Sequence, residues 1–211
     1  MELKQLSAEL QRRFDEKMEA RERALPAARR AIRFSANAIR AIHRGETKEA
    51  GRLMEEAAAA LREGEAAVAD HPDVRYAGFL HDAQKEYAET RLTEAVIEGK
   101  APPAPDDLRV TPAAYLNGMS EAIGEGRRAV LDLLRRGEVA RADDLLQAMD
   151  DMYDVLVSMD YPDAITGNLR RSTDVARSII EKTRGDLSVS LVQRDLRDAL
   201  ERHADDLRGD R

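Results

Sequence analysis

The chain has 211 residues, of which 43% are hydrophobic and 36% charged, a balance too apolar for a disordered chain and too polar for a membrane protein. It has no cysteine, which excludes disulfides and thiolate metal sites, and its N-terminal segment has no apolar signal core, so we expect a cytoplasmic protein without a membrane partner. The net charge of −7 argues against a surface that binds nucleic acid over its whole extent, although it permits a local basic groove.

Apolar residues recur at helical spacing along nearly the whole chain, and aromatic residues make up only 4% of it. This pattern predicts an all-α fold. Short connections make successive helices antiparallel neighbours, and no segment is long enough for an interdomain linker, so we expect residues 1–211 to form a single antiparallel helical bundle. The predicted helices are seven, at about 2–43, 48–69, 72–98, 111–136, 139–159, 167–183 and 188–207.

Two of these helices carry features beyond one buried face. The first has an apolar stripe, and Pro26 within it predicts a kink or a break. The stripe consists of Leu3, Leu6, Leu10, Phe14 and Met18. The helix at 139–159 has more apolar residues than one packed face requires, which predicts either a subunit interface or burial on two sides. These residues are Leu145, Leu146, Met149, Met152, Tyr153 and Leu156.

Two pairs of glutamates lie on consecutive predicted helices. Glu86 and Glu89 are three residues apart, and Glu121 and Glu125 are four apart, so each pair shares one helix face. A single pair of this kind is most often a solvated surface feature. Four carboxylates that face one another, however, would repel at neutral pH unless a cation lies among them. Hard oxygen ligands favour Mg²⁺ or Mn²⁺.

The surroundings of the second pair favour a site. Gly118, Gly124 and Gly126 lie within nine residues of a predicted helix, where each glycine costs about 1 kcal/mol relative to alanine. Such a cluster indicates the close approach of another helix or of a substrate backbone.

Other chemistries lack their residues. The four histidines provide no Glu-x-x-His pair, which argues against a di-iron bundle. The chain also has no HExxH, phosphate-loop or GxSxG motif. Metal-assisted hydrolysis remains, with phosphoryl compounds as the natural substrate class.

The motifs around the glutamates resemble the translin superfamily. Glu86-Tyr87-Ala88-Glu89-Thr90 is similar to the Glu-Tyr-x-Glu-Ala motif of its catalytic type, translin-associated factor X. Arg109-Val110-Thr111-Pro112, followed by Tyr115-Leu116-x-Gly118, is similar to the start of that type's next helix, in which Glu121 stands where the family has aspartate. Weaker similarity extends from about residue 29 to 185 and includes Arg40-Ala41-Ile42-His43-Arg44, Leu169-Arg170, Asp174, Glu181 and Arg184-Gly185.

The resemblance implies the seven-helix translin fold, a homo-oligomer with an octamer favoured, and single-stranded RNA or single-stranded DNA as the partner. It also implies a metal-dependent endoribonuclease, a hydrolase in which Glu86, Glu89, Glu121 and Glu125 bind Mg²⁺ or Mn²⁺ and catalyse cleavage. Solvation, or salt bridges to Arg91, Arg127 or Arg128, is the structural alternative for these glutamates.

Further residues are candidates for contact with RNA. Arg29, Arg33, Arg40 and Arg44 form a basic stripe on the first helix, which lines an RNA path or is simply a solvated face. His81, one turn before the glutamates, is a candidate RNA contact or proton shuttle, although a boundary residue of the core is the more common case. Tyr76, Tyr87 and Tyr115 are candidates for base stacking, with core packing the favoured interpretation.

Three other functions stay open from the sequence. An all-α nucleoside triphosphate pyrophosphatase also places acidic pairs on bundle helices around Mg²⁺. A non-catalytic oligomer that binds RNA or DNA, and a structural helical scaffold, complete the alternatives.

Overall fold

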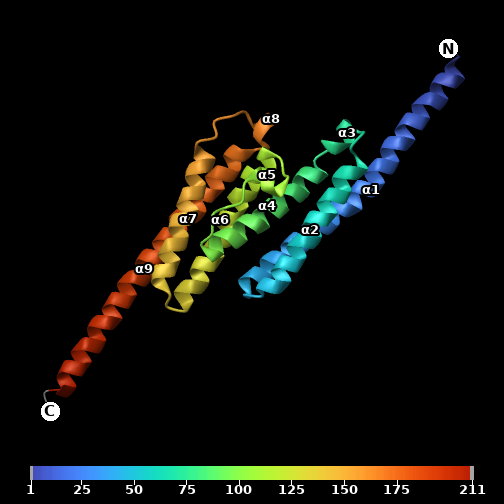
Figure 1. The fold of residues 1–211 in the computed structure, drawn as a ribbon. Coiled ribbons are helices and arrows are strands. Elements are labelled where there is room, and N and C mark those ends of the chain that lie inside the picture. Colours follow the sequence, from blue (N-terminus) through green and yellow to red (C-terminus); the bar gives the residue numbers. More distant parts are fainter. Residues whose placement is uncertain (1, 210–211) are drawn as a thin grey trace.

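The computed structural model describes residues 2–209, apart from the side chains of residues 206, 207 and 209, and all of its regular structure is helical. The all-α prediction is confirmed. The described residues form nine helices, three of which have only four residues (Figure 1). Their bounds are α1 Leu3–His43, α2 Thr47–Ala67, α3 Pro72–Arg75, α4 Phe79–Glu98, α5 Pro105–Leu108, α6 Pro112–Arg135, α7 Val139–Val157, α8 Asp163–Thr166 and α9 Leu169–Gly209.

Two predicted boundaries were wrong. The helix expected at 72–98 is divided into α3 and α4, because Gly78 adopts a φ of 99° that interrupts the helical path. The break expected after Arg184-Gly185 is absent, and α9 continues through Gly185, since a glycine within a helix weakens it without ending it. The sequence from Leu3 to His43 is likewise one helix, and Pro26 does not break it.

Close packing of small residues joins the first two helices. Seven alanines of α1 are buried, and α2 returns antiparallel along this face after a short turn at Gly45, whose φ is 73° (Figure 1). Helix α4 packs against both, and α6 packs between α4 on one side and α7 and α9 on the other. The largest fully buried side chains include Leu92, Ile123 and Met149, one each from α4, α6 and α7. The core therefore centres on the helices that carry the glutamate pairs.

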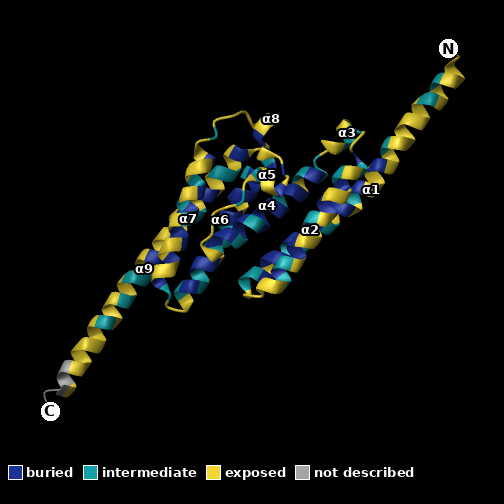
Figure 2. Cartoon of the chain, in the orientation of Figure 1, coloured by how far each residue is buried: buried dark blue, intermediate teal, exposed yellow. Residues whose placement is uncertain are grey.

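Both ends of the chain extend beyond this core in opposite directions (Figure 1). The N-terminal arm, residues 3–18 of α1, and the C-terminal arm, residues 189–205 of α9, are mostly exposed (Figure 2). The apolar stripe predicted on the first helix is present but has no partner among the residues that the structure describes: Phe14 is 68% exposed. The C-terminal arm repeats the feature, with Val189, Val192, Leu196 and Leu200 exposed.

Helix α7 is buried on two sides, between α6 and α9. The six apolar residues singled out from the sequence are buried within the chain, except for the half-buried Tyr153, so the second of the two predicted explanations holds. None of the described helices combines the length and apolarity needed to cross a membrane.

Candidate metal centre

The two glutamate-bearing helices approach each other closely at Gly118. A Cβ atom at this position would lie 2.7 Å from the backbone carbonyl oxygen of Lys85 and 2.8 Å from the amide nitrogen of Glu89, so only glycine fits without a shift of the backbone. The prediction that glycines permit helix contact is confirmed here and at Gly126, where a Cβ would lie 3.0 Å from Met149 Cγ. Gly124 has no such contact, since its nearest neighbour would be 3.9 Å away.

Three of the four predicted carboxylates lie together. One oxygen from each of Glu86, Glu89 and Glu121 falls within 4.8 Å of the others, a spacing from which three ligands can reach one cation. Glu86 is half-buried, Glu89 is buried and Glu121 is exposed, so the cluster leads from the helix interface to solvent. The carboxylates come from two helices whose spacing is set at Gly118, and their separation therefore depends on that contact.

Glu89 is the deepest member of the cluster. It is 8% exposed and makes no side-chain hydrogen bond or salt bridge with any residue that the structure describes. Burial, together with the negative charges of Glu86, Glu121 and Glu125, raises the pKa of Glu89 to about 8, while Lys85 opposes the shift. At neutral pH this carboxyl group therefore holds a proton unless a cation stabilises its charged form.

Lys85 supplies a cation at the outer side of the cluster. Its Nζ donates to both carboxylate oxygens of Glu121, at 2.6 and 2.8 Å, and lies 3.3 Å from Oε1 of Glu86. Burial by itself would lower the pKa of Lys85, but the hydrogen bond to Glu121 and the nearby negative charges outweigh it and the pKa is raised. Lys85 is therefore a charged member of the centre that the sequence did not single out.

Glu125 lies beside the cluster and has a different partner. Its Oε2 is 2.5 Å from Nε2 of His43, the last residue of α1, whose side chain is only 4% exposed. This hydrogen bond is the main reason that the pKa of Glu125 is lowered, with Arg128 at 3.7 Å adding to the effect. His43 was missed as a site residue, although the matched segment at the end of the first helix contains it. Contact between α1 and α6 brings the two together.

The arginines named as structural partners of the glutamates play little part. Arg91 contacts Tyr87 and Glu94, and Arg127 pairs with Asp186 at 2.8 Å. Among the described residues, only Arg128 of the three reaches one of the four glutamates. The acidic centre is consequently not neutralised by these arginines.

A cavity of about 370 Å³ opens onto the cluster between α6 and the first turns of α9. Asn117 fixes this wall, since its Nδ2 donates to the carbonyl oxygen of Thr166 at 2.7 Å and its Oδ1 accepts from Ser172 Oγ at 3.3 Å. Arg171 faces the same cavity and is exposed, and it forms no salt bridge with the described residues. The lining residues are Glu89, Ser120, Glu121, Gly124, Arg171, Ser172, Val175 and Ile179. A cavity with two carboxylates and one unpaired arginine suits a phosphorylated ligand bound through a cation.

The predicted basic stripe is exposed along α1, and three of its four arginines contact different neighbouring side chains. Arg33 stacks over Phe34 at 5.7 Å, Arg40 donates to Asn37, and Arg44 pairs with Glu46. Arg29 completes the stripe and is also exposed. The stripe ends at Arg44, which follows His43, the residue that pairs with Glu125.

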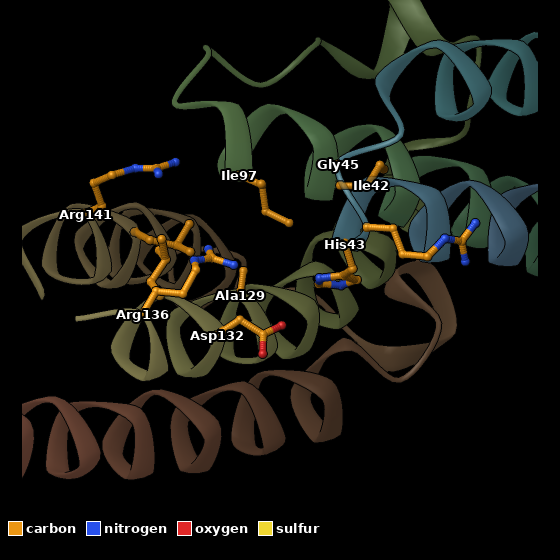
Figure 3. Close-up of a pocket in the computed structure, with 11 residues that line it drawn as sticks. Ile42, His43, Gly45, Ile97, Ala129, Asp132, Arg136 and Arg141 are labelled. Atoms are coloured by element: carbon orange, nitrogen blue, oxygen red, sulfur yellow. The ribbon is translucent and has the colours of Figure 1, made fainter. Parts of the chain in front are cut away.

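A second cavity, of about 260 Å³, borders His43 (Figure 3). Arg136 at the end of α6 and Arg141 of α7 contribute guanidinium groups to it, and Ile42 and Ile97 give it apolar surface. Both arginines also pair with Glu138. The basic character of the stripe thus continues onto the ends of α6 and α7.

The remaining candidates divide between surface and core. His81 is half-buried, lies against Gly167 and belongs to no metal-ligand cluster among the described residues. Tyr87 and Tyr115 are buried as expected, and the Tyr115 hydroxyl donates to the carbonyl oxygen of Pro103 at 2.9 Å. The core position predicted for Tyr76 was wrong: it follows the short helix α3 and is 76% exposed, because the turn at Gly78 separates it from α4.

Comparison with solved structures gives a match over most of the chain. A structure of AfC3PO in complex with duplex RNA is 33% identical, with a TM-score of 0.82 over 89% of this chain and 97% of that chain. The crystal structure of AfC3PO itself gives the same values. Apo-NeC3PO, with 22% identity and a TM-score of 0.75, covers 89% of this chain and 96% of its own and supports the fold alone.

Comparison with other sequences adds one relative. An uncharacterized protein of Methanocaldococcus jannaschii is 29% identical over 184 residues, which are 86% of this chain and 81% of that protein. No family model matches the chain. AfC3PO is translin-like, and its 33% identity to this chain over 97% of its own length shows that the two proteins are related. The chain therefore belongs to the translin superfamily.

Proposed function

We propose that this chain is a translin-type RNA-binding protein and a metal-dependent endoribonuclease of the factor X type. The observation that carries the proposal is Glu89, a buried carboxyl group without a protein partner, whose oxygen shares a 4.8 Å cluster with Glu86 and Glu121. The likeness to AfC3PO, which has been solved with duplex RNA, supports RNA as the ligand.

The residues present suit a divalent cation. Glu86, Glu89 and Glu121 would hold Mg²⁺ or Mn²⁺ through hard oxygen ligands, and such a cation would stabilise the charged form of Glu89, which burial and the neighbouring carboxylates disfavour. When bound, such an ion activates water and stabilises negative charge on a phosphate. Glu121 replaces the shorter aspartate of the family, and its exposed side chain has room to adjust.

Two further residues have roles of their own. Glu125 is held by His43 in its ionised form and accepts a proton from the attacking water, because a carboxylate with a fixed orientation is a suitable base. Arg171, in the cavity wall, donates to the phosphate that is cleaved.

The RNA strand reaches this centre along α1. Arg29, Arg33, Arg40 and Arg44 contact its phosphates, since guanidinium groups pair well with phosphate oxygens. His81 is a further RNA contact, at the border of the cavity that also contains the exposed Tyr76. The acidic net charge limits this binding to the groove and disfavours attachment elsewhere.

The chain acts as a homo-oligomer, with an octamer favoured. The two arms support this: both are mostly exposed (Figure 2), and each has a row of apolar residues at helical spacing that none of the described residues covers. The arms point in opposite directions, so a single copy cannot pair them with each other (Figure 1). Other copies would cover them.

The test is cleavage of labelled single-stranded RNA, with duplex RNA as a second substrate, in Mg²⁺, in Mn²⁺ and in EDTA. Glu125→Gln and Glu89→Gln are expected to abolish cleavage while RNA binding and native mass stay unchanged. Glu98→Gln, at the exposed end of α4, is the matched control and should cleave normally. Full activity in either site variant would refute the assignment.

The same experiment separates the other functions. RNA binding without metal-dependent cleavage would leave a non-catalytic binding protein. Hydrolysis of dUTP or another nucleotide, with RNA untouched, would point to a pyrophosphatase. A chain that binds neither metal nor RNA would be a structural scaffold.

A further inference from the structure

Lys85 occupies part of the space that a metal would need. Its ammonium group bonds both oxygens of Glu121 and lies 3.3 Å from Glu86, so two of the three clustered carboxylates already have a cationic partner. Its side chain is only 21% exposed, which marks it as a member of the centre and not a mobile surface lysine. Glu89 is the one carboxylate of the three without such a partner.

The geometry makes Lys85 and a divalent ion competitors. Mg²⁺ has ligands at about 2.1 Å in octahedral arrangement, so neighbouring oxygens lie about 3 Å apart. The oxygens of Glu86, Glu89 and Glu121 spread over as much as 4.8 Å, and must close in to share one ion. While both of its oxygens accept from the ammonium group, Glu121 has fewer free lone pairs with which to bind an ion.

We propose that Lys85 is an internal counter-ion that holds the metal-free centre in place and is displaced from Glu121 when the divalent ion binds. The inference rests on the proposed metal centre. Lys85 would thus weaken metal binding in two ways: it occupies the oxygens of Glu121, and its positive charge repels a second cation at short range. Without metal, it would lessen repulsion among the carboxylates and so stabilise the fold.

The experiment measures Mn²⁺ binding to the full chain by calorimetry and by the electron paramagnetic resonance signal of free Mn²⁺, with no RNA present. Lys85→Met keeps the length of the side chain and removes its charge, and we expect it to bind Mn²⁺ at least about tenfold more tightly. Lys85→Arg keeps the charge and should remain close to the wild-type affinity. Lys100→Met is the matched control, since Lys100 also pairs with a glutamate of α4, Glu98, at 2.6 Å but lies at the exposed end.

A second measurement is thermal stability in EDTA, where Lys85→Met should melt at a lower temperature than Lys100→Met. If Lys85→Met is unfolded without metal, Mn²⁺ must restore its helical circular dichroism, and failure to do so overturns the inference. Equal or weaker Mn²⁺ binding by Lys85→Met also overturns it. These outcomes differ from failure of the proposed function, in which neither the wild-type chain nor any variant would bind Mn²⁺.

Discussion

Replacing Glu89 with glutamine should change how the stability of the metal-free protein depends on pH. The pKa of this carboxyl group rises from 4.5 to about 8 in the folded protein, chiefly because it is buried. A raised pKa in a carboxylic acid means that the folded state holds a proton that the unfolded chain has already lost. Wild-type stability should therefore fall as the pH rises from about 4.5 to about 8, and level off above that.

The size of the effect follows from these two pKa values. Each pH unit between them costs the folded state about 1.4 kcal/mol, so the penalty is about 3 kcal/mol at pH 7 and about 5 kcal/mol above pH 8. Glutamine has nearly the same shape and no charge. Glu89→Gln should then match the wild type near pH 4.5 and exceed it by about 3 kcal/mol at pH 7, in the absence of metal.

Urea unfolding followed by circular dichroism, from pH 5 to pH 9 in EDTA, measures both proteins. Saturating Mg²⁺ should reverse the order at pH 8, because an ion that binds the folded state alone stabilises the wild type and not the variant. A difference between the two proteins that is the same at pH 5 and pH 8 would refute the reasoning, since it would mean that Glu89 is not a buried acid that titrates in this range.

Three further predictions concern packing, the second acidic partner and assembly. Gly118→Ala should destabilise the protein by about 2 kcal/mol or more, because its Cβ meets backbone atoms of α4 at 2.7 Å. Gly124→Ala, whose Cβ makes only an ordinary van der Waals contact with Ile179 at 3.9 Å, should stabilise it by about 0.5–1 kcal/mol, and urea unfolding measures both changes. His43→Ala should lower the free energy of unfolding by about 1–3 kcal/mol at pH 7 and by less at pH 3. The hydrogen bond from His43 lowers the pKa of Glu125, and its stabilising effect disappears as that carboxylate is protonated. Equal losses of stability at pH 7 and pH 3 would contradict this. Phe14→Glu combined with Met18→Glu should lower the native mass in light scattering without loss of helix, and an unchanged mass would exclude the N-terminal arm from the subunit contacts.

Much of the fold could be predicted because it depends on local patterns. Helical spacing of apolar residues predicted helical structure in every long helix, although it divided α9 in two. Thr111-Pro112 marked the start of α6, where the Thr111 side chain accepts from the amide of Ala114. The turn at Gly78 and the continuity of α9 past Gly185 could not be predicted. A glycine serves equally as a helix interruption or a helix residue, and the residue type by itself does not decide which φ angle it adopts.

The candidate site could be predicted only in part from the same local patterns. Spacing placed Glu86 with Glu89, and Glu121 with Glu125, on shared faces, and glycine content indicated the helix contact that brings one face to the other. The sequence could not show that Glu125 lies beside the cluster formed by the other three glutamates. Its partner His43 is 82 residues away on α1, and only the packed bundle brings them together.

The sequence by itself determined which residues form helices, which faces are apolar and which carboxylates share a face, because these follow from a repeat of 3.6 residues. Only the tertiary structure decided which charges meet. Lys85 pairs with Glu121 across two helices, Glu89 is left buried without a partner, and the apolar stripe of the N-terminal arm lies outside the core. Burial and charge pairing are properties of the distances between segments, and those distances are fixed only when the helices pack.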